Sequence, residues 1–223
     1  AARSREIRDG LFQHRIYILT TSASNPLEGP WEIAGRMETG RDTFCLDATT
    51  FQHRGRDYFV WAQKDAAIPG NSNLYIAPMS SPTRLAGEAV MLSRPEHDWE
   101  VQGFLVNEGP AVLVRNGKVL LTYSASATDH RYCMGLLHAD ESADLLRPES
   151  WSKSARPVLR TSETLYGPGH NSFTVSADGR QDLMVFHARD YADITGDPLW
   201  NPDRHTFVRA VGWDERGMPL FTR

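Results

Sequence analysis

The chain has 223 residues, of which 40% are hydrophobic and 23% are charged, and its formal net charge is −4. This composition is ordinary for a globular protein of one large or two small domains. Charges of both signs are interspersed, so no basic block indicates nucleic-acid binding, and no run of 18 apolar residues indicates a membrane span.

Short apolar and aromatic runs follow one another along the chain, each bounded by Gly, Pro, Asn or Asp. They are too short for amphipathic helices and rich in Tyr, Phe, Val and Ile, so they predict strands. In chain order, the clearest runs are residues 15–22, 57–63, 73–79, 118–126 and 182–189. Turns that place Gly where a hairpin needs positive φ lie at 53–56, 115–118 and 177–180. One short helical turn is expected at 140–146.

A repeat aligns these hairpins. Residues 46–62, 107–125 and 169–189 match one another by their turns. A further strand follows each hairpin, at 73–79, 132–140 and 205–213, and a fourth is expected near 89–93, 157–160 and 219–223. Four antiparallel strands per repeat predict the blades of a β-propeller. The alternative is a β-sandwich in which the regular spacing is accidental.

We therefore expect an all-β fold, a single β-propeller domain over residues 1–223. No low-complexity segment or linker marks a domain boundary. The repeat predicts about four blades, roughly at 1–46, 47–107, 108–169 and 170–223.

A polar residue stands just before the first strand of each repeat. These residues are Asp47, Glu108 and His170, which are 61 and 62 residues apart. Because the innermost strand of every blade lines the central channel, we expect the three side chains to meet in one axial pocket. Two carboxylates at one pocket are the groups that glycoside hydrolysis needs. For any one of them, the alternative is a solvated turn carboxylate.

The stretches around these residues resemble glycoside hydrolase family 43. The resemblance covers essentially the whole chain and is carried by LDATTF, QGFLVNEGP, YGPGHNSF and FHAR at 46–51, 102–110, 166–173 and 186–189. It implies a five-bladed propeller acting mainly on arabinans and xylans, and it is nearest to the exo-acting α-L-arabinofuranosidases of that family.

The resemblance implies roles for four residues by position. Glu108 in NEGP matches the general acid, and Asp47 in LDA matches the carboxylate that orients the acid and modulates its pKa. His170 in GPGHNSF matches a histidine associated with a bound cation, often calcium, held largely through waters; calcium prefers oxygen ligands. Arg189 in FHAR matches an arginine that reaches the sugar hydroxyls and the acid. His170 as a core histidine and Arg189 as a structural ion pair remain the alternatives.

Aromatic residues near the motifs are further candidates for sugar contact. Phe104 precedes the acid by four residues, and Trp61 and Trp99 have faces on which a sugar could stack. The long loop 190–204 holds Trp200, a candidate for a further subsite. Most aromatic side chains in a propeller instead pack between blades.

The chain departs from the family at its start. The family's catalytic base is an aspartate of the first blade, whereas the first recognisable hairpin here, residues 7–22, looks like blade two. Glu6 fits the blade-two slot, and neither Asp9 nor Asp42 occupies the base position. We expect the sequence to lack an N-terminal blade. A non-catalytic carbohydrate binder and a four-bladed ring with a relocated base are the alternatives.

The expected function is therefore hydrolysis of α-L-arabinofuranosides with inversion, by a site completed by a missing N-terminal blade or second polypeptide. A β-xylosidase of the same fold and a binding module are the rivals. The expected partners are arabinose- or xylose-containing oligosaccharides, with a cation near His170. Residues 1–10 show no apolar signal-peptide core, and Cys45 and Cys133 either pair or stay buried thiols. The resemblance alone favours an extracellular location.

Overall fold

The computed structural model describes residues 13–221, so Glu6 and Asp9 lie outside the described residues. Strands joined by turns make up this part of the chain, and its helical segments are two short 3₁₀ turns, η1 (Asp98–Glu100) and η2 (Pro148–Ser150). Neither is long and apolar enough to cross a membrane. The helical turn expected at 140–146 is instead a pair of successive tight turns, closed by the amides of Ala143 and Arg147.

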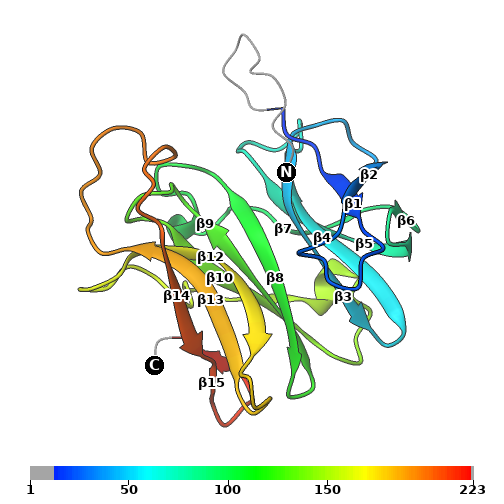
Figure 1. The fold of residues 1–223 in the computed structure, drawn as a ribbon. Coiled ribbons are helices and arrows are strands. Elements are labelled where there is room, and N and C mark those ends of the chain that lie inside the picture. The colour runs from blue at the N-terminus through cyan, green and yellow to red at the C-terminus, as the bar shows by residue number, and fades with distance from the viewer. Residues whose placement is uncertain (1–12, 222–223) are drawn as a thin grey trace.

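The strands form consecutive antiparallel sheets in chain order (Figure 1). The first sheet pairs β1 (Tyr17–Thr20) with β2 (Glu32–Arg36). The second contains β3 (Cys45–His53), β4 (Arg56–Gln63), β5 (Asn73–Ser81), β6 (Arg84–Leu85) and β7 (Val90–Ser93). The third contains β8 (Asn107–Arg115), β9 (Lys118–Ala125), β10 (Cys133–Asp140) and β11 (Ser152–Lys153).

The chain closes with two smaller sheets. One contains β12 (Tyr166–Val175), β13 (Asp182–Arg189) and β14 (His205–Ala210), and the other pairs β15 (Gly212–Trp213) with β16 (Pro219–Leu220). The expected fourth strand near 89–93 is β7, and near 157–160 a bridge joins Leu159 to Met134 of β10. Near 219–223 the expected strand pairs with β15 and not with β14.

The predicted hairpin turns are confirmed. Arg54 and Gly55 join β3 to β4 with φ of 51° and 75°, and Asn116 and Gly117 join β8 to β9 with φ of 53° and 73°. Positive φ at both central residues is the type I′ pattern, whose twist matches that of the flanking strands. Local turn chemistry thus fixes the register of both central hairpins.

The inner strand of each large sheet carries a β-bulge near its start. In β3, Asp47 and Ala48 together lie opposite one residue of β4; β8 and β12 have the same irregularity after Glu108 and Gly169. The first bulged residues are Asp47, Gly109 and His170, with φ of 53°, 56° and 48°. Bulges re-aim side chains and increase strand twist. Here they turn equivalent positions of three sheets toward one region.

The core lies between successive sheets. Val60 and Ala62 of β4 pack with Leu121 of β9, whereas the alternate residues Phe59 and Trp61 pack toward the first sheet. Because neighbouring residues of a strand point to opposite faces, each central sheet is buried on both sides. Cys45 and Cys133 are both buried free thiols, so they do not form the disulfide that the sequence left open.

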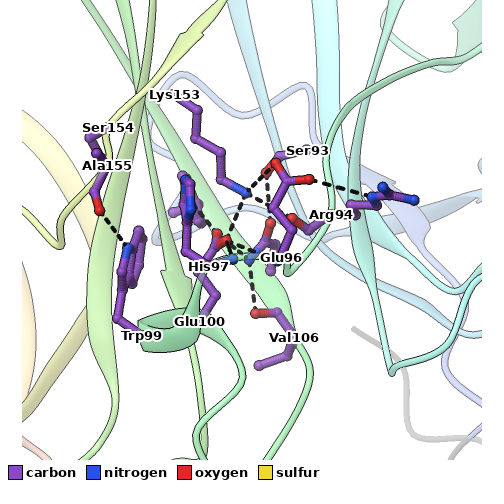
Figure 2. A network of polar contacts seen from close by, with 12 residues as sticks. Ser93, Arg94, Glu96, His97, Trp99, Glu100, Val106, Lys153, Ser154 and Ala155 are labelled. Atoms are coloured by element: carbon purple, nitrogen blue, oxygen red, sulfur yellow. Dashed lines mark hydrogen bonds and ion pairs between the residues drawn. The ribbon is translucent and has the colours of Figure 1, made fainter.

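A buried polar network joins the second sheet to the third (Figure 2). The fully buried Glu100 carboxylate accepts hydrogen bonds from Asn107 Nδ2 at 3.1 Å and Tyr123 Oη at 2.8 Å, and it pairs with Lys153 Nζ at 2.8 Å. Asn107 also receives a hydrogen bond from Ser93 Oγ at 2.7 Å. A buried charge is tolerated when it is paired and hydrogen-bonded, as here. The network therefore fixes the start of β8, directly before Glu108.

The outermost sheets expose apolar side chains. On the first sheet these are Tyr17, Leu19 and Ile33, and Ile33 is 72% exposed. On the last large sheet they are Val175 and Val208. In Figure 1 these two sheets lie at opposite sides of the ribbon.

Candidate active site

A cavity of about 680 Å³ opens where the inner strands begin. Its walls come from the starts of β3, β8 and β12 and from the loops between strands, and they include Asp47, Glu108 and His170. A larger groove of about 1020 Å³ lies between β2 and the β5–β6 region, with none of these three residues in its walls. The smaller cavity is therefore the one whose walls bring Asp47 and Glu108 together.

The three polar residues predicted from the repeat meet in this cavity. Asp47, Glu108 and His170 each offer one ligand atom, and these atoms lie within 4.8 Å of one another. Asp47 Oδ2 accepts a hydrogen bond from the Gly109 amide at 3.1 Å, and its Oδ1 is 3.9 Å from His170 Nε2. The Asp47 carboxylate is thus held between two sheets, beside the acid candidate.

The structure corrects the equivalence of the three positions. By register, Asp47 corresponds to Gly109 and His170, whereas Glu108 corresponds to Leu46 and Gly169, one residue earlier. Gly109 occupies the equivalent slot because its φ is 56° and because a Cβ there would lie 3.1 Å from the His170 ring. Glu108 therefore reaches the cavity from the position before the bulge.

The surroundings of Glu108 suit a group that stays protonated. Burial is the main cause that raises its pKa, and the nearby Asp47 charge raises it further. A hydrogen bond from Tyr132 and the charges of His170 and Arg204 lower this pKa. The net effect is a pKa above the ordinary value. A carboxyl group with a raised pKa can donate a proton near neutral pH.

Tyr132 is a site residue that the sequence analysis missed. Its hydroxyl donates to Glu108 Oε1 at 2.6 Å, and the side chain is 1% exposed. It stands directly before β10, outside any of the repeated motifs, so no spacing pointed to it. The signal that could have found it is its position at the start of the strand expected at 132–140, directly after the hairpin that carries Glu108.

Some of the aromatic candidates line the cavity and others do not. Phe104 lines the cavity and is 47% exposed, as a sugar-contacting wall requires, and Trp200 also lines it. The expectation for Trp61 is corrected: the indole is fully buried, packs on Phe59 and Tyr75, and lines no part of the cavity. Trp99 likewise does not line the cavity, because its indole N–H donates to Ala155 O at 3.1 Å.

Arg189 does not reach the cavity. The residue is 1% exposed, and its guanidinium donates to Asn201 Oδ1 at 2.9 Å, Thr128 O at 2.9 Å and Pro198 O at 3.2 Å. It thereby ties the 190–204 loop to the neighbouring loop through uncharged acceptors, which is a structural role but not the ion pair of the alternative. The cavity wall instead contains Arg131 and Arg204.

Asp42, one of the alternative bases, lies elsewhere. Its carboxylate pairs with Arg15 at 2.8 Å and Arg36 at 3.1 Å and is largely exposed. It does not line the cavity. Among residues 13–221, the carboxylates that line the cavity are Asp47, Glu108, Asp129 and Asp197, and Asp129 pairs with Arg131.

Several known proteins are similar to this chain. The model of the family "Glycosyl hydrolases family 43" matches residues 4–219. The chain is 50% identical over 209 residues to an extracellular exo-α-(1→5)-L-arabinofuranosidase of Streptomyces avermitilis, covering 93% of this chain and 44% of that protein. It is 49% identical to α-L-arabinofuranosidase 43 of Humicola insolens, covering 95% of this chain and 45% of that protein.

A solved structure is also similar. The crystal structure of α-L-arabinofuranosidase from Lactobacillus brevis matches with a TM-score of 0.93 and 53% identity, over 96% of this chain and 67% of that one. The chain thus spans less than half the length of the two curated relatives described above.

Proposed function

The chain belongs to glycosyl hydrolases family 43, and from that premise we propose that the complete protein releases α-L-arabinofuranosyl units from arabinan or arabinose-decorated oligosaccharides with inversion. The observation that carries the proposal is the pair formed by Glu108 and Asp47 in the 680 Å³ cavity. The named activities of the similar proteins from Streptomyces avermitilis and Lactobacillus brevis support the choice of sugar.

In the proposed mechanism, Glu108 protonates the glycosidic oxygen as the bond breaks through an oxocarbenium-like transition state. The raised pKa of Glu108 keeps the proton available. Asp47 raises that pKa by its charge and is itself held by the Gly109 amide. A base on the opposite face of the sugar activates water, and inversion requires a gap of roughly 6.5–9.5 Å between the two carboxyl groups.

We propose that this base belongs to a blade that is not part of residues 13–221, on the same chain or on a second polypeptide. The exposed apolar residues of the two outermost sheets support this proposal, because patches such as Leu19 with Ile33 normally pack against another element. The partial coverage of the relatives agrees with it.

We also propose a hydrated cation, calcium in the first instance, in the channel near His170. Asp47 Oδ1 lies 3.9 Å from His170 Nε2, so a carboxylate oxygen and an imidazole face the same part of the channel, and Glu108 keeps its role as the acid. A single imidazole is a poor ligand for a hard cation, so waters would complete its coordination and no proton transfer passes through it. A calcium-dependent rise in melting temperature, lost in His170→Ala, is the expected result.

We place the protein outside the cell by the same reasoning, since relatives from two Streptomyces species are named extracellular.

The test uses the complete protein and three substrates: 4-nitrophenyl α-L-arabinofuranoside, the matching β-xylopyranoside and an α-1,5-arabino-oligosaccharide. We expect hydrolysis of both arabinosides, with proton NMR showing the inverted anomer as the first product. Faster cleavage of the xyloside would make the enzyme a xylosidase. Binding without cleavage of any of the three would make it a carbohydrate-binding protein.

A further inference from the structure

Tyr132 touches the carboxyl group on which the proposed chemistry depends. Its hydroxyl is 2.6 Å from Glu108 Oε1, and only 1% of its surface is exposed. A hydroxyl hydrogen bond to a carboxyl group becomes short and strong when the carboxyl group is ionised, as Glu108 is once it has given up its proton. One oxygen of Glu108 is therefore engaged by the protein.

The tyrosine ring is held on both sides. It stacks on His187 of β13 at a centroid distance of 5.6 Å and an interplanar angle of 11°. Gly169 of β12 passes so close that a Cβ there would lie 2.3 Å from Tyr132 Cε1. The Tyr132 amide also donates to Asp129 O at 3.1 Å. The position of the hydroxyl is thus set by β12 and β13 and by the preceding loop.

The hydrogen bond fixes which oxygen of Glu108 the protein engages. The one proton of the tyrosine hydroxyl is donated to Oε1. Next to it, the His170 amide donates to Ser124 Oγ at 2.7 Å and holds the start of the β12 bulge in place. An acid proton on Glu108 consequently belongs to the other oxygen, Oε2.

We propose that Tyr132 is a positioning residue for Glu108: it holds Oε1 and leaves Oε2 as the oxygen that carries the proton to the substrate. This inference rests on the proposed role of Glu108 as general acid. The other charged groups that act on Glu108 are Asp47 of β3, His170 of β12 and Arg204 of the 190–204 loop. None of them is hydrogen-bonded to Oε1 in the way that Tyr132 is.

Tyr123 supplies a matched control. It too is a fully buried tyrosine whose hydroxyl donates to a glutamate, Glu100 Oε1, at 2.8 Å. That glutamate belongs to the network of Figure 2 and does not line the cavity. Tyr123→Phe therefore removes the same kind of hydrogen bond away from the acid.

The first experiment reads the bond directly and needs no activity. Infrared spectra at fixed pH isolate the carboxylic C=O stretch of Glu108 as the band lost in Glu108→Gln. In Tyr132→Phe we expect this band to move to higher wavenumber, because its carbonyl oxygen has lost a donor, whereas Tyr123→Phe leaves it in place. An unmoved band in Tyr132→Phe, or equal movement in both variants, overturns the proposal.

A second experiment tests the same hydrogen bond without a substitution, in case Tyr132→Phe does not fold. Parent protein grown with 3-fluorotyrosine has a more acidic phenol, which is a stronger donor, so the Glu108 band should move to lower wavenumber. An unchanged band would again overturn the proposal.

Kinetics of the complete protein separate positioning from general damage. Tyr132→Phe should lower kcat on the arabino-oligosaccharide about tenfold, the effect of one charge-assisted hydrogen bond, with KM nearly unchanged. An arabinoside with a dinitrophenyl leaving group needs little protonation and should lose less than about twofold. Equal losses on both substrates overturn the inference. A parent protein that cleaves neither substrate overturns the proposed function, while the infrared result still decides the role of Tyr132.

Discussion

At the residue scale, Glu108 and Asp47 are two carboxyl groups in different surroundings. Glu108 is affected mainly by burial, which raises its pKa, and it accepts a hydrogen bond from Tyr132. Asp47 accepts the Gly109 amide and faces His170. Different environments are what allow two neighbouring carboxyl groups to take different roles.

Glu108→Gln should lower turnover of the complete protein on arabino-oligosaccharides by about a hundredfold or more, because the amide has no acid proton to donate. A substrate with a very good leaving group should lose far less. Initial rates on both substrates check this. Asp182→Asn, which alters an ion pair with Arg115 outside the cavity, is the control. Equal rates for Glu108→Gln and the parent would remove Glu108 from the role.

Asp47→Asn should change the shape of the pH–rate profile. The Asp47 charge raises the pKa of Glu108, so its removal lowers that pKa. Because activity needs protonated Glu108 and is lost as pH rises through its pKa, the basic limb should move to lower pH, and the rate should also fall. A profile of unchanged shape with weaker substrate binding would instead make Asp47 a sugar ligand.

The sequence predicted some site residues and not others, for physical reasons. Asp47, Glu108 and His170 were found because they recur at one place in a repeat, and Phe104 was found by its nearness to the acid. The expectation that Trp61 contacts sugar was wrong, because a residue in a strand buried on both faces has no solvent-facing side. Tyr132 and Arg204 belong to no repeated motif, so only the fold brings them to the cavity.

At the element scale, the bulges decide how the inner strands present their side chains. Gly109→Ala should destabilise the fold and reduce activity. The alanine must adopt the positive φ of this position, 56°, and its Cβ would lie 3.1 Å from the His170 ring. Gly117→Ala is the matched control: φ is 73° there, but no atom lies within 4 Å of the added Cβ.

For Gly117→Ala we expect a loss of about 1 kcal/mol in the free energy of unfolding and full activity, from left-handed strain alone. Urea unfolding and initial rates measure both quantities. Similar losses of activity in the two variants would show that the contact with His170 is unimportant.

The Glu100 network is expected to respond to mutation as a buried ion pair. Glu100→Gln should cost about 3–5 kcal/mol, because it leaves the Lys153 ammonium with an incomplete partner. The double variant Glu100→Gln/Lys153→Met should recover part of that loss. Urea unfolding of the parent, of Glu100→Gln, of Lys153→Met and of the double variant forms the cycle. A double variant less stable than Glu100→Gln alone would show that Lys153 is useful without its partner.

The same network makes the free energy of unfolding depend on pH. Burial alone would raise the pKa of Glu100, but hydrogen bonds from Lys153 and from the amides of His97 and Glu96 outweigh it and leave the pKa below its ordinary value. A lowered pKa in the folded state stabilises the protein above the unfolded pKa of about 4.3, and this contribution is lost as pH falls through the folded value. Unfolding measured between pH 7 and pH 3 should therefore be less acid-sensitive in Glu100→Gln.

Element boundaries show what patterns along a chain can predict. The hairpins at 53–56 and 115–118 followed from their Gly-containing turns, and both are present. The bulges did not follow, because in β3 and β8 only two strand residues precede the bulge, too few to show a shift in the alternation of side chains. That is why Glu108 seemed equivalent to Asp47 and His170, whereas it precedes their position by one residue.

At the scale of the whole molecule, the expected all-β propeller fold and family are confirmed by the family match and by the similarity to the Lactobacillus brevis structure. These followed from the repeat and its motifs. The blade limits at 47, 108 and 170 remain predictions, and β3 begins at Cys45, two residues before the first of them.

Residues 1–223 alone should hydrolyse arabinosides poorly, because the proposed base is not among the described residues. Adding the proposed further blade, on the same chain or as a second polypeptide, should restore hydrolysis and raise the melting temperature, since it would cover apolar residues of the outermost sheets. Calorimetry and rates with and without the added segment check this. Robust hydrolysis without the segment, abolished by Asp9→Asn, would show that the base is relocated.

The exposed apolar faces give a related expectation. Without a covering blade, the chain should self-associate at high concentration, and Ile33→Asp with Val208→Asp should reduce this association. Sedimentation velocity of the double variant against the parent measures it. Thr174→Asp, an exposed polar position on the last large sheet, is the control.

The left-handed backbone shared by Asp47, Gly109 and His170 also restricts how this protein can evolve. Beyond glycine, the residue types most tolerant of that conformation are Asn, Asp and His. The positions that face the channel can therefore drift among only a few amino acids without disturbing the sheets. That small set includes a carboxylate and an imidazole, so the backbone conformation itself keeps groups that carry charge or transfer protons available at these positions.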